Sequence, residues 1–322
     1  MNARFIKTGL KAAVAAITAS IVSTSAMAED FPSKPIRIIN AFAPGGATDT
    51  AIRGLTANAD TFIDQPIVIE SVTGGGGVTG ILKAAKSDPD GHTLLVADTV
   101  MTTLPLFQDN LPVSAADFKP IGVFNLRGAW LLTRPAKGWK TLDDFVAAAK
   151  ADPGGMTVGV PSLSSPQHMA VAAIEDTYGI DVNIIPYGGG APTMGALLGD
   201  QIDAAMPGAP AGLDSVTAGD AVFLVASTDI ELQKFEGEII SFNDVGIPHD
   251  LGIWTAVWAP KDTPDDVMAQ LGEIFGNMAT SDEWTEFARG YGVTPMWKPL
   301  DEAVAYIEKS SDSMGKLAEI LK

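Results

Sequence analysis

The stretch ESVTGGGGVTG at residues 70–80 has the residue types and spacing of a nucleotide-binding loop. Its glycines match G-x-G-x-x-G at Gly75, Gly77 and Gly80. In that pattern the glycines allow a tight turn and bring the backbone close to a pyrophosphate. An apolar run at 66–70 precedes the loop, a helix-like segment at 81–87 follows it, and Asp98 ends the next apolar run. Taken alone, the stretch is consistent with a nicotinamide-dependent enzyme in which Asp98 binds a ribose.

A second loop, AFAPGGATDTAIR at 41–53, follows an apolar run and opens a predicted helix. Glycines here let the backbone approach a ligand. The unpaired amides of a helix N-terminus, together with the helix dipole, form an anion site. The candidate anion-binding residues are Gly45, Gly46, Ala47, Thr48 and Asp49. Thr48 or Asp49 could instead cap the helix, and for Asp49 capping and ligand binding are compatible.

Two further loops repeat this arrangement of strand, small residues and helix. In VPSLSSPQHM (160–169), hydroxyls gather at Ser162, Ser164 and Ser165 before a helix that has Pro166 in its first turn. Ser165 suits the N-cap position and Pro166 the first helical position. The other loop is IPYGGGAPTM (185–194). A tight turn explains each glycine set taken singly, but such loops on facing units favour an anion-binding cleft.

The elements that must position these loops alternate between strand and helix. The first unit has strands predicted at 34–43, 66–70 and 93–98 and helices at 49–62 and 81–87. The second has helices at 141–154, 165–179 and 190–201 and strands at 156–162, 181–187, 202–207 and 221–227. A strand at 253–260 and helices at 264–279 and 301–320 complete the chain. A proline-punctuated segment covers 105–120, and 121–135 forms one long strand or two.

This alternation predicts an α/β fold of two domains, each a central sheet flanked by helices. The first domain is expected at 29–127 and 253–322, and the second at 128–252. Ligands of open α/β sheets bind beyond the carboxyl ends of the strands. We therefore expect a ligand in the interdomain cleft and hinged closure over it.

The N-terminus is typical of a secretory signal peptide. It carries Arg4, Lys7 and Lys11, then an apolar stretch at 12–22 and a small-residue cleavage site that ends at Ala28. The alternative, an amphipathic first helix of the mature domain, lacks a polar face. The chain has no cysteine and therefore no disulfide or lipid-modified cysteine. These features predict residues 1–28 as a cleaved signal and a soluble protein of a bacterial periplasm.

The chain is strongly acidic, with 39 Asp and Glu against 21 Lys and Arg and a formal net charge of −18. This charge argues against nucleic acid as a partner. The negative net charge does not attract an anionic ligand either, so the binding of an anion would have to rely on local dipoles.

Enzymatic and metal chemistry have little support in the sequence. The three histidines, His92, His168 and His249, lack the i, i+4 spacing of metal ligands. There is no Walker loop or G-x-S-x-G elbow. We predict neither a metal nor a cofactor. The alternative to a binding protein is a secreted hydrolase of carboxylates or esters that uses Ser165 and His168.

Motifs along the whole predicted mature chain resemble receptors of tripartite tricarboxylate transporters, also called Bug proteins. They are FPSKPIRIINAFAPGGATDTAIR, GGGGVTG, SDPDGHTLLVA, DFKPIG, SSPQH, PYGGGAPTMGALLGDQID and DVGIPHDLGIWTAVWAPKDTPDDV. The resemblance implies a type II periplasmic binding fold, often described as a Venus flytrap. It also implies a monomeric receptor, not inserted in the membrane, that passes small carboxylates to a permease of one large and one small subunit.

The resemblance further implies which residues bind the ligand. The carboxylate would be held by Phe42 and the Gly45–Asp49 loop and by the serine loop from Ser162 to His168. Thr99 and the turn at Tyr187, Gly188 and Gly189 would line the rest of the cleft. The stretch that opens this subsection matches the receptors' second glycine loop, which favours a structural turn over a dinucleotide site.

The sequence departs from the family pattern at several positions. Ser162 and Ser164 replace glycines, Glu70-Ser71 replaces Asn-Arg, His92 replaces a tyrosine, and Asp98 stands where a neutral residue is common. An ionised Asp98 in a carboxylate cleft is unfavourable unless it is paired or faces away. A second negative charge on the ligand would need a partner such as Arg127, which the sequence does not place.

Overall fold

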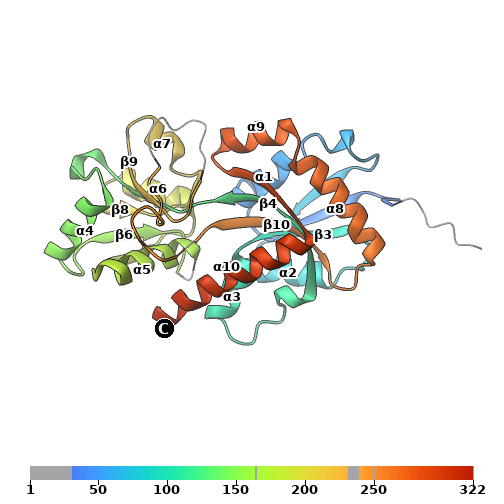
Figure 1. Ribbon diagram of the computed structural model, residues 1–322, viewed down its shortest axis with the longest axis horizontal. Helices are drawn as coiled ribbons and strands as arrows, with labels where there is room; N and C mark the ends of the chain where they lie inside the picture. The colour runs from blue at the N-terminus through green and yellow to red at the C-terminus, as the bar shows by residue number, and fades with distance from the viewer. Residues whose placement is uncertain (1–30, 164, 231–238, 250, 322) are drawn as a thin grey trace, which may run out of the picture. The chain divides into compact units, whose positions relative to one another are not determined.

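The computed structural model describes residues 31–163, 165–230, 239–249 and 251–321 (Figure 1). The predicted signal peptide and Ser164 therefore lie outside the described residues. Pro32–Lys322 form one compact unit, which contains two mixed sheets. The predicted α/β class, with two sheets flanked by helices, is confirmed.

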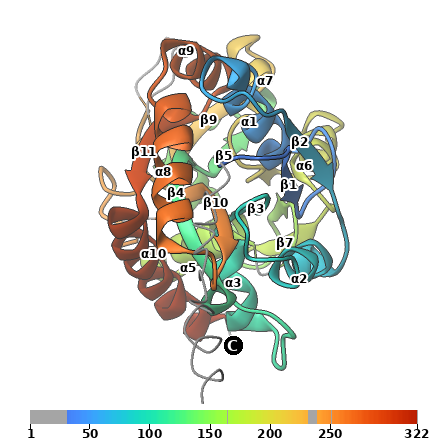
Figure 2. The ribbon, with the colours of Figure 1, turned by 90° about the vertical axis from the view of Figure 1, so that its right-hand side faces the viewer.

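The first sheet has six strands in the order β11-β4-β10-β3-β1-β2, which follow one another across Figure 2. Their bounds are β1 Ile36–Asn40, β2 Ile67–Ser71, β3 Thr93–Asp98, β4 Phe118–Arg127, β10 Ile253–Pro260 and β11 Thr294–Pro299. Strand β1 runs parallel to β2 and β3, whereas β10 is antiparallel to both β3 and β4. The apolar runs read at 34–43, 93–98 and 253–260 are thus central strands of this sheet, and the run at 66–70 is its edge strand β2.

Helices cover both faces of the first sheet. They are α1 Ala47–Leu55, α2 Val78–Ala85, α3 Val100–Phe107, α8 Asp265–Ala279, α9 Asp282–Tyr291 and α10 Leu300–Ile320. On one face, Ile81 of α2, Met101 of α3 and Ile307 of α10 share a core with the strands. On the other face, Phe124 of β4 meets Trp284 of α9 edge to face. Burial of these apolar faces holds the strand ends, and the loops that follow them, in place.

The second sheet has five strands in the order β7-β6-β8-β5-β9. Their bounds are β5 Trp130–Thr133, β6 Thr157–Val160, β7 Asn183–Pro186, β8 Ala204–Ala205 and β9 Val222–Ala226. The accompanying helices are α4 Leu142–Ala151, α5 Pro166–Tyr178, α6 Gly190–Leu198 and α7 Leu213–Thr217. Helices α4 and α5 pack on one face of the sheet, and α6 and α7 pack on the other.

The chain passes between the sheets at two places, after β4 and before β10. Ser227 joins these passages, because its hydroxyl accepts a hydrogen bond from the Ala129 amide and donates one to the Leu251 carbonyl. Helix α10 also contacts both halves. Its N-terminal half packs against the first sheet, and Met314 and Leu317 belong to the core of the second (Figure 1). The domain boundaries at 127/128 and 252/253 stay a prediction.

Some elements differ from those expected. The segment 121–135 divides between strands of the two sheets, β4 and β5. Helix α3 was not predicted, and its last residues, 105–107, overlap the proline-punctuated segment at 105–120. Helices α7 and α9 and strand β11 were not expected. Short 3₁₀ turns lie at Ala59–Thr61, Gly75–Gly77, Ala115–Asp117 and Pro135–Lys137.

Candidate functional site

A cavity of about 680 Å³ is lined by residues from both sheet units. This volume lies within the usual range for small-molecule sites. Its lining from the first unit comes from the segments after β1, β2 and β3, and from Arg127 and Ile253. Its lining from the second unit comes from the segments after β6 and β7. The cavity therefore lies beyond strand carboxyl ends, as expected for an α/β fold.

Helix N-termini meet at this cavity. Its lining includes Gly77 at the start of α2, Thr99 at the start of α3, Ser165 at the start of α5 and Gly189 at the start of α6. The first amides of a helix have no intrahelical partner and carry partial positive charge. Several such ends around one space favour an anion without any cationic side chain.

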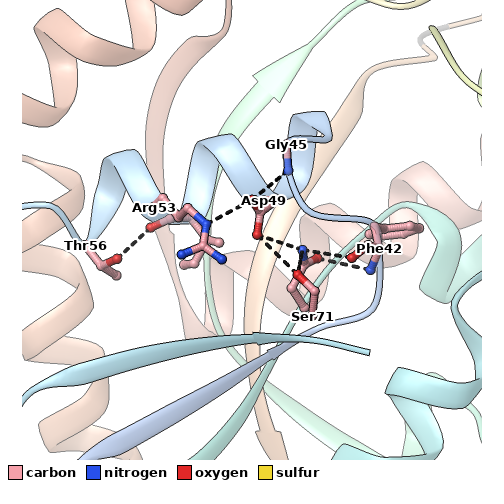
Figure 3. Close-up of polar contacts among 8 residues, drawn as sticks. Phe42, Gly45, Asp49, Arg53, Thr56 and Ser71 are labelled. Carbon is pink, nitrogen blue, oxygen red and sulfur yellow. Dashed lines mark hydrogen bonds and ion pairs between the residues drawn. The ribbon is translucent and has the colours of Figure 1, made fainter. Parts of the chain in front are cut away.

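The first glycine loop is held by the carboxylate of Asp49, which is 3% exposed (Figure 3). Asp49 Oδ2 accepts hydrogen bonds from the Gly45 amide and from Arg53 Nε, both at 2.9 Å. Asp49 Oδ1 accepts from Asn40 Nδ2 at 3.2 Å and from Ser71 Oγ at 3.4 Å. Asp49 therefore stabilises the turn into α1, but it is not the helix cap considered from the sequence, because Gly46 is the N-cap and no side chain caps the helix.

The ionised form of Asp49 is favoured by these contacts. Burial acts to raise the pKa of this carboxyl, but the hydrogen bonds from Arg53 and Gly45 and the Arg53 charge lower the pKa overall. Phe42, with its neighbours Ala41 and Ala43, lines the cavity. The segment from Gly45 to Asp49 is not among the lining residues, so its contact with a ligand stays a prediction.

The serine loop reaches the cavity through Ser162 and Ser165. Ser165 is the N-cap of α5: its hydroxyl accepts from the His168 amide at 3.2 Å and donates to the Ser162 carbonyl at 2.7 Å. His168 lies in the first turn of the helix, is not a lining residue, and has its pKa lowered by burial.

In the third loop, Gly188 and Gly189 line the cavity and Tyr187 does not. The ligand contacts of Tyr187 and His168 stay predictions.

The second glycine loop also lines the cavity, through Gly74, Gly76 and Gly77. All three have positive φ, at 135°, 68° and 109° respectively, so the turn itself requires glycine. This loop is therefore both a structural turn, as favoured from the sequence, and part of the cavity wall. Its position after a strand and before a helix was the sequence feature that could have placed this loop among the predicted ligand-binding residues.

An ion pair between Asp98 and Arg127 lies in the wall of the cavity. Arg127 Nη2 donates to Asp98 Oδ2 at 2.6 Å, and Arg127 Nη1 donates to Thr255 Oγ1 at 2.8 Å. The same Asp98 oxygen accepts from the Thr48 hydroxyl at 3.3 Å, while Oδ1 accepts from the Val100 amide at 3.0 Å. Asp98 is therefore paired with a cation, which is one of the two arrangements in which an ionised Asp98 is acceptable in a carboxylate cleft.

Beside this pair, the Thr99 hydroxyl is buried without a hydrogen-bond partner among the described residues, and Thr99 lines the cavity. Across the described ranges, no group of three or more His, Cys, Asp or Glu is placed to hold a metal ion. No helix in the described part of the chain is both long and apolar enough to cross a membrane.

Comparisons with known proteins agree on one group. Residues 51–322 match the sequence profile of the tripartite tricarboxylate transporter family receptors. The chain is 28% identical over 298 residues to BugT of Bordetella pertussis, with 89% of each chain covered.

Two solved structures show the same fold. An R. palustris protein solved with adipate aligns with a TM-score of 0.82 at 22% identity, covering 90% of this chain and 98% of that one. MatC from Rhodopseudomonas palustris with bound malate aligns with a TM-score of 0.73 at 22% identity, covering 91% and 100%.

Proposed function

Because the chain belongs to the tripartite tricarboxylate transporter receptor family, we propose that it binds a small organic carboxylate in the described cavity. The observation that carries this proposal is the meeting of the N-termini of α2, α3, α5 and α6 at one space lined by both sheet units. Their dipoles, and the first amides that make no other hydrogen bond, would supply the positive potential that a carboxylate needs in a protein of net charge −18. The Val100 amide of α3 already donates to Asp98, and the His168 amide of α5 to the Ser165 hydroxyl.

The ligand-binding set contains residues that line the cavity and residues assigned by resemblance alone. Those lining the cavity are Phe42, Thr99, Ser162, Ser165, Gly188 and Gly189. Those proposed to contact the ligand when the two sheet units close are Gly45, Gly46, Ala47, Thr48, Asp49, Ser164, His168 and Tyr187. The adipate and malate in the two structures with this fold are small carboxylates and support the ligand class.

The receptor would then deliver its ligand to a membrane permease of one large and one small subunit, as family membership implies. We propose that it does so as a monomer in the periplasm, after removal of residues 1–28. The secretory character of the N-terminus supports this location.

The hydrolase alternative receives no support from the serine loop. The Ser165 hydroxyl donates to the Ser162 carbonyl and accepts from a main-chain amide, so it acts as a helix cap. A nucleophile would instead donate its proton to a base. The dinucleotide alternative is disfavoured too, because the Asp98 carboxylate is already bound by Arg127, Thr48 and Val100.

A thermal-shift screen of the purified protein against mono-, di- and tricarboxylates tests the proposal. Binding to the native state raises stability by mass action, by about 2.7 kcal/mol at a hundredfold excess over Kd. Denaturation followed by mass spectrometry identifies any acid that was retained during purification. A protein that releases no acid and is shifted by none would contradict the proposal.

A variant pair locates the binding. Ser162→Asp places a negative charge on an exposed residue of the cavity lining and should abolish the shift. Ser33→Asp makes the same change at an exposed position outside the lining and should leave the shift intact. Equal loss in both variants would place the ligand elsewhere.

A further inference from the structure

We propose that this cavity selects ligands with a single carboxylate and an apolar body, and that the Asp98–Arg127 pair excludes a second carboxylate. The inference rests on the proposed function and narrows its ligand class. It depends on the charges that line the cavity, on how Arg127 is held, and on the character of the remaining wall.

The charges of the wall cancel. Among the described residues that line the cavity, Asp98 and Arg127 are the ones that carry a formal charge. His168, in the first turn of α5, is not a lining residue, and burial lowers its pKa, which disfavours the charged imidazolium. One carboxylate can use the helix N-termini, but a second would enter a wall without an unpaired cation. An ionised group buried without a partner is strongly disfavoured.

Arg127 is not available to a ligand in this arrangement. Its side chain is 7% exposed, and its two terminal nitrogens donate to Asp98 and to Thr255. Asp98 is also fixed, by the Val100 amide and the Thr48 hydroxyl. A ligand carboxylate that took over the bond from Arg127 Nη2 would displace Asp98, which would then be a buried carboxylate without its cation.

The rest of the wall suits an apolar ligand body. The large apolar side chains that line the cavity are Phe42, Leu104, Phe107, Leu163 and Ile253. Thr99 also lines the cavity, and its buried hydroxyl makes no hydrogen bond among the described residues. A monocarboxylate with an aliphatic or aromatic body matches this wall better than a ligand charged at both ends.

Matched ligands test the proposal on the unmodified protein. Calorimetric titration would compare adipate with its monoamide, which has the same length and shape but one charge, and with hexanoate. A second set would compare phthalate with its monoamide and with benzoate. We expect at least one set to bind, with the monoanion favoured about tenfold or more over the matched dianion. A dianion that binds equally or more tightly would overturn the inference.

The variant Asp98→Asn tests the mechanism of exclusion. It keeps the shape of the side chain but leaves Arg127 with an uncompensated positive charge. The preference for the monoanion should fall about tenfold or reverse. Asp90→Asn is the matched control, because Asp90 also pairs with a cation, Lys34 at 2.8 Å, but lies outside the cavity lining. An unchanged preference in Asp98→Asn would overturn the role of the pair.

These outcomes are separate from those that decide the proposed function. If no carboxylate binds, the receptor proposal itself fails. If dicarboxylates bind best, the receptor proposal stands and only the inference on charge fails. If Asp98→Asn does not fold, the ratios measured on the unmodified protein still decide whether monoanions are selected.

Discussion

Two buried threonines near the start of α3 differ in what their hydroxyls do. Thr99 lines the cavity and its buried hydroxyl has no hydrogen-bond partner among the described residues, whereas the Thr102 hydroxyl donates to the Thr99 carbonyl at 3.0 Å. Thr99→Val should therefore leave the free protein at least as stable and weaken ligand binding by about 1 kcal/mol, the usual net value of one hydrogen bond.

Thr102→Val should show the opposite pattern, with lower stability and unchanged affinity. Chemical denaturation and calorimetric titration of both variants separate the two effects. If Thr99→Val bound the ligand as tightly as the unmodified protein, the Thr99 hydroxyl would not be a ligand contact.

Asp49 is expected to contribute a pH-dependent part of stability. Its folded pKa is depressed, so its contribution is present above the ordinary carboxyl pKa of about 3.9 and is lost as pH falls through the lower folded pKa. Asp49→Asn should lower the free energy of unfolding by about 1–3 kcal/mol at pH 7, because hydrogen bonds to a charged group are lost.

Below about pH 4 the difference between Asp49→Asn and the unmodified protein should shrink. Urea denaturation across pH 3–7 measures it, with the exposed Asp60→Asn as control. A difference that stays constant over this range would show that the charge of Asp49 does not stabilise the fold.

The sequence indicated some residues of the site and not others, for a physical reason. Ser162, Gly188 and Gly189 were found because each lies where a predicted strand ends and a helix follows, so local order placed them at a sheet edge. The pairing of Asp98 with Arg127 depends on strand register. Thr255 lies opposite Asp98, and Ile253 lies opposite Arg127 two residues along β10. No local pattern encodes such a register.

At the scale of elements, α2 approaches β1 so closely that only glycine fits at position 80. A Cβ on Gly80 would lie 2.6 Å from the Val72 carbonyl oxygen and 2.8 Å from Ala41 Cα. Gly80→Ala should therefore force α2 away from the strand and move the Gly74–Gly77 loop at the cavity. We expect lower stability, by about 1–3 kcal/mol as for other overpacked sites, together with weaker carboxylate binding.

Gly272→Ala in α8 is the matched control, because no packed neighbour lies within 4 Å of the place that its methyl group would take, and alanine favours a helix. It should stabilise the protein by up to about 1 kcal/mol. Thermal denaturation and ligand titration of both variants test the difference. Equal behaviour of the two alanines would show that α2 can shift at no cost.

Elements with strong periodicity were predicted well, and those whose signal comes from tertiary packing were not. Strand β3 agrees with the predicted 93–98, and α5 begins after the predicted cap Ser165. Helix α3 was missed because Pro105 favours a break, yet it lies near the C-terminal end of that helix, where few backbone bonds are lost. Strand β11 has prolines at 295 and 299 and sits at the sheet edge, where proline is tolerated.

At the scale of the whole described unit, α10 and the two chain passages connect the sheets. The α10 residues Ala303 and Ile307 pack with the first sheet, and Met314, Leu317 and Ala318 pack with the second. Trp254 of β10 donates from Nε1 to Ser310 Oγ at 3.0 Å, near the middle of the helix. The proposed closure over a ligand would therefore have to bend or slide this helix as well as the chain passages that Ser227 joins.

This connection predicts that both sheets unfold in one transition. Scanning calorimetry of the unmodified protein should give a single peak whose calorimetric and van't Hoff enthalpies agree. Leu317→Ala, at a fully buried position, should lower the free energy of unfolding by about 2–5 kcal/mol and move the whole peak. Val304→Ala, at an exposed position of the same helix, should move it little. Two resolved peaks, of which Leu317→Ala moves only one, would show that α10 does not couple the sheets.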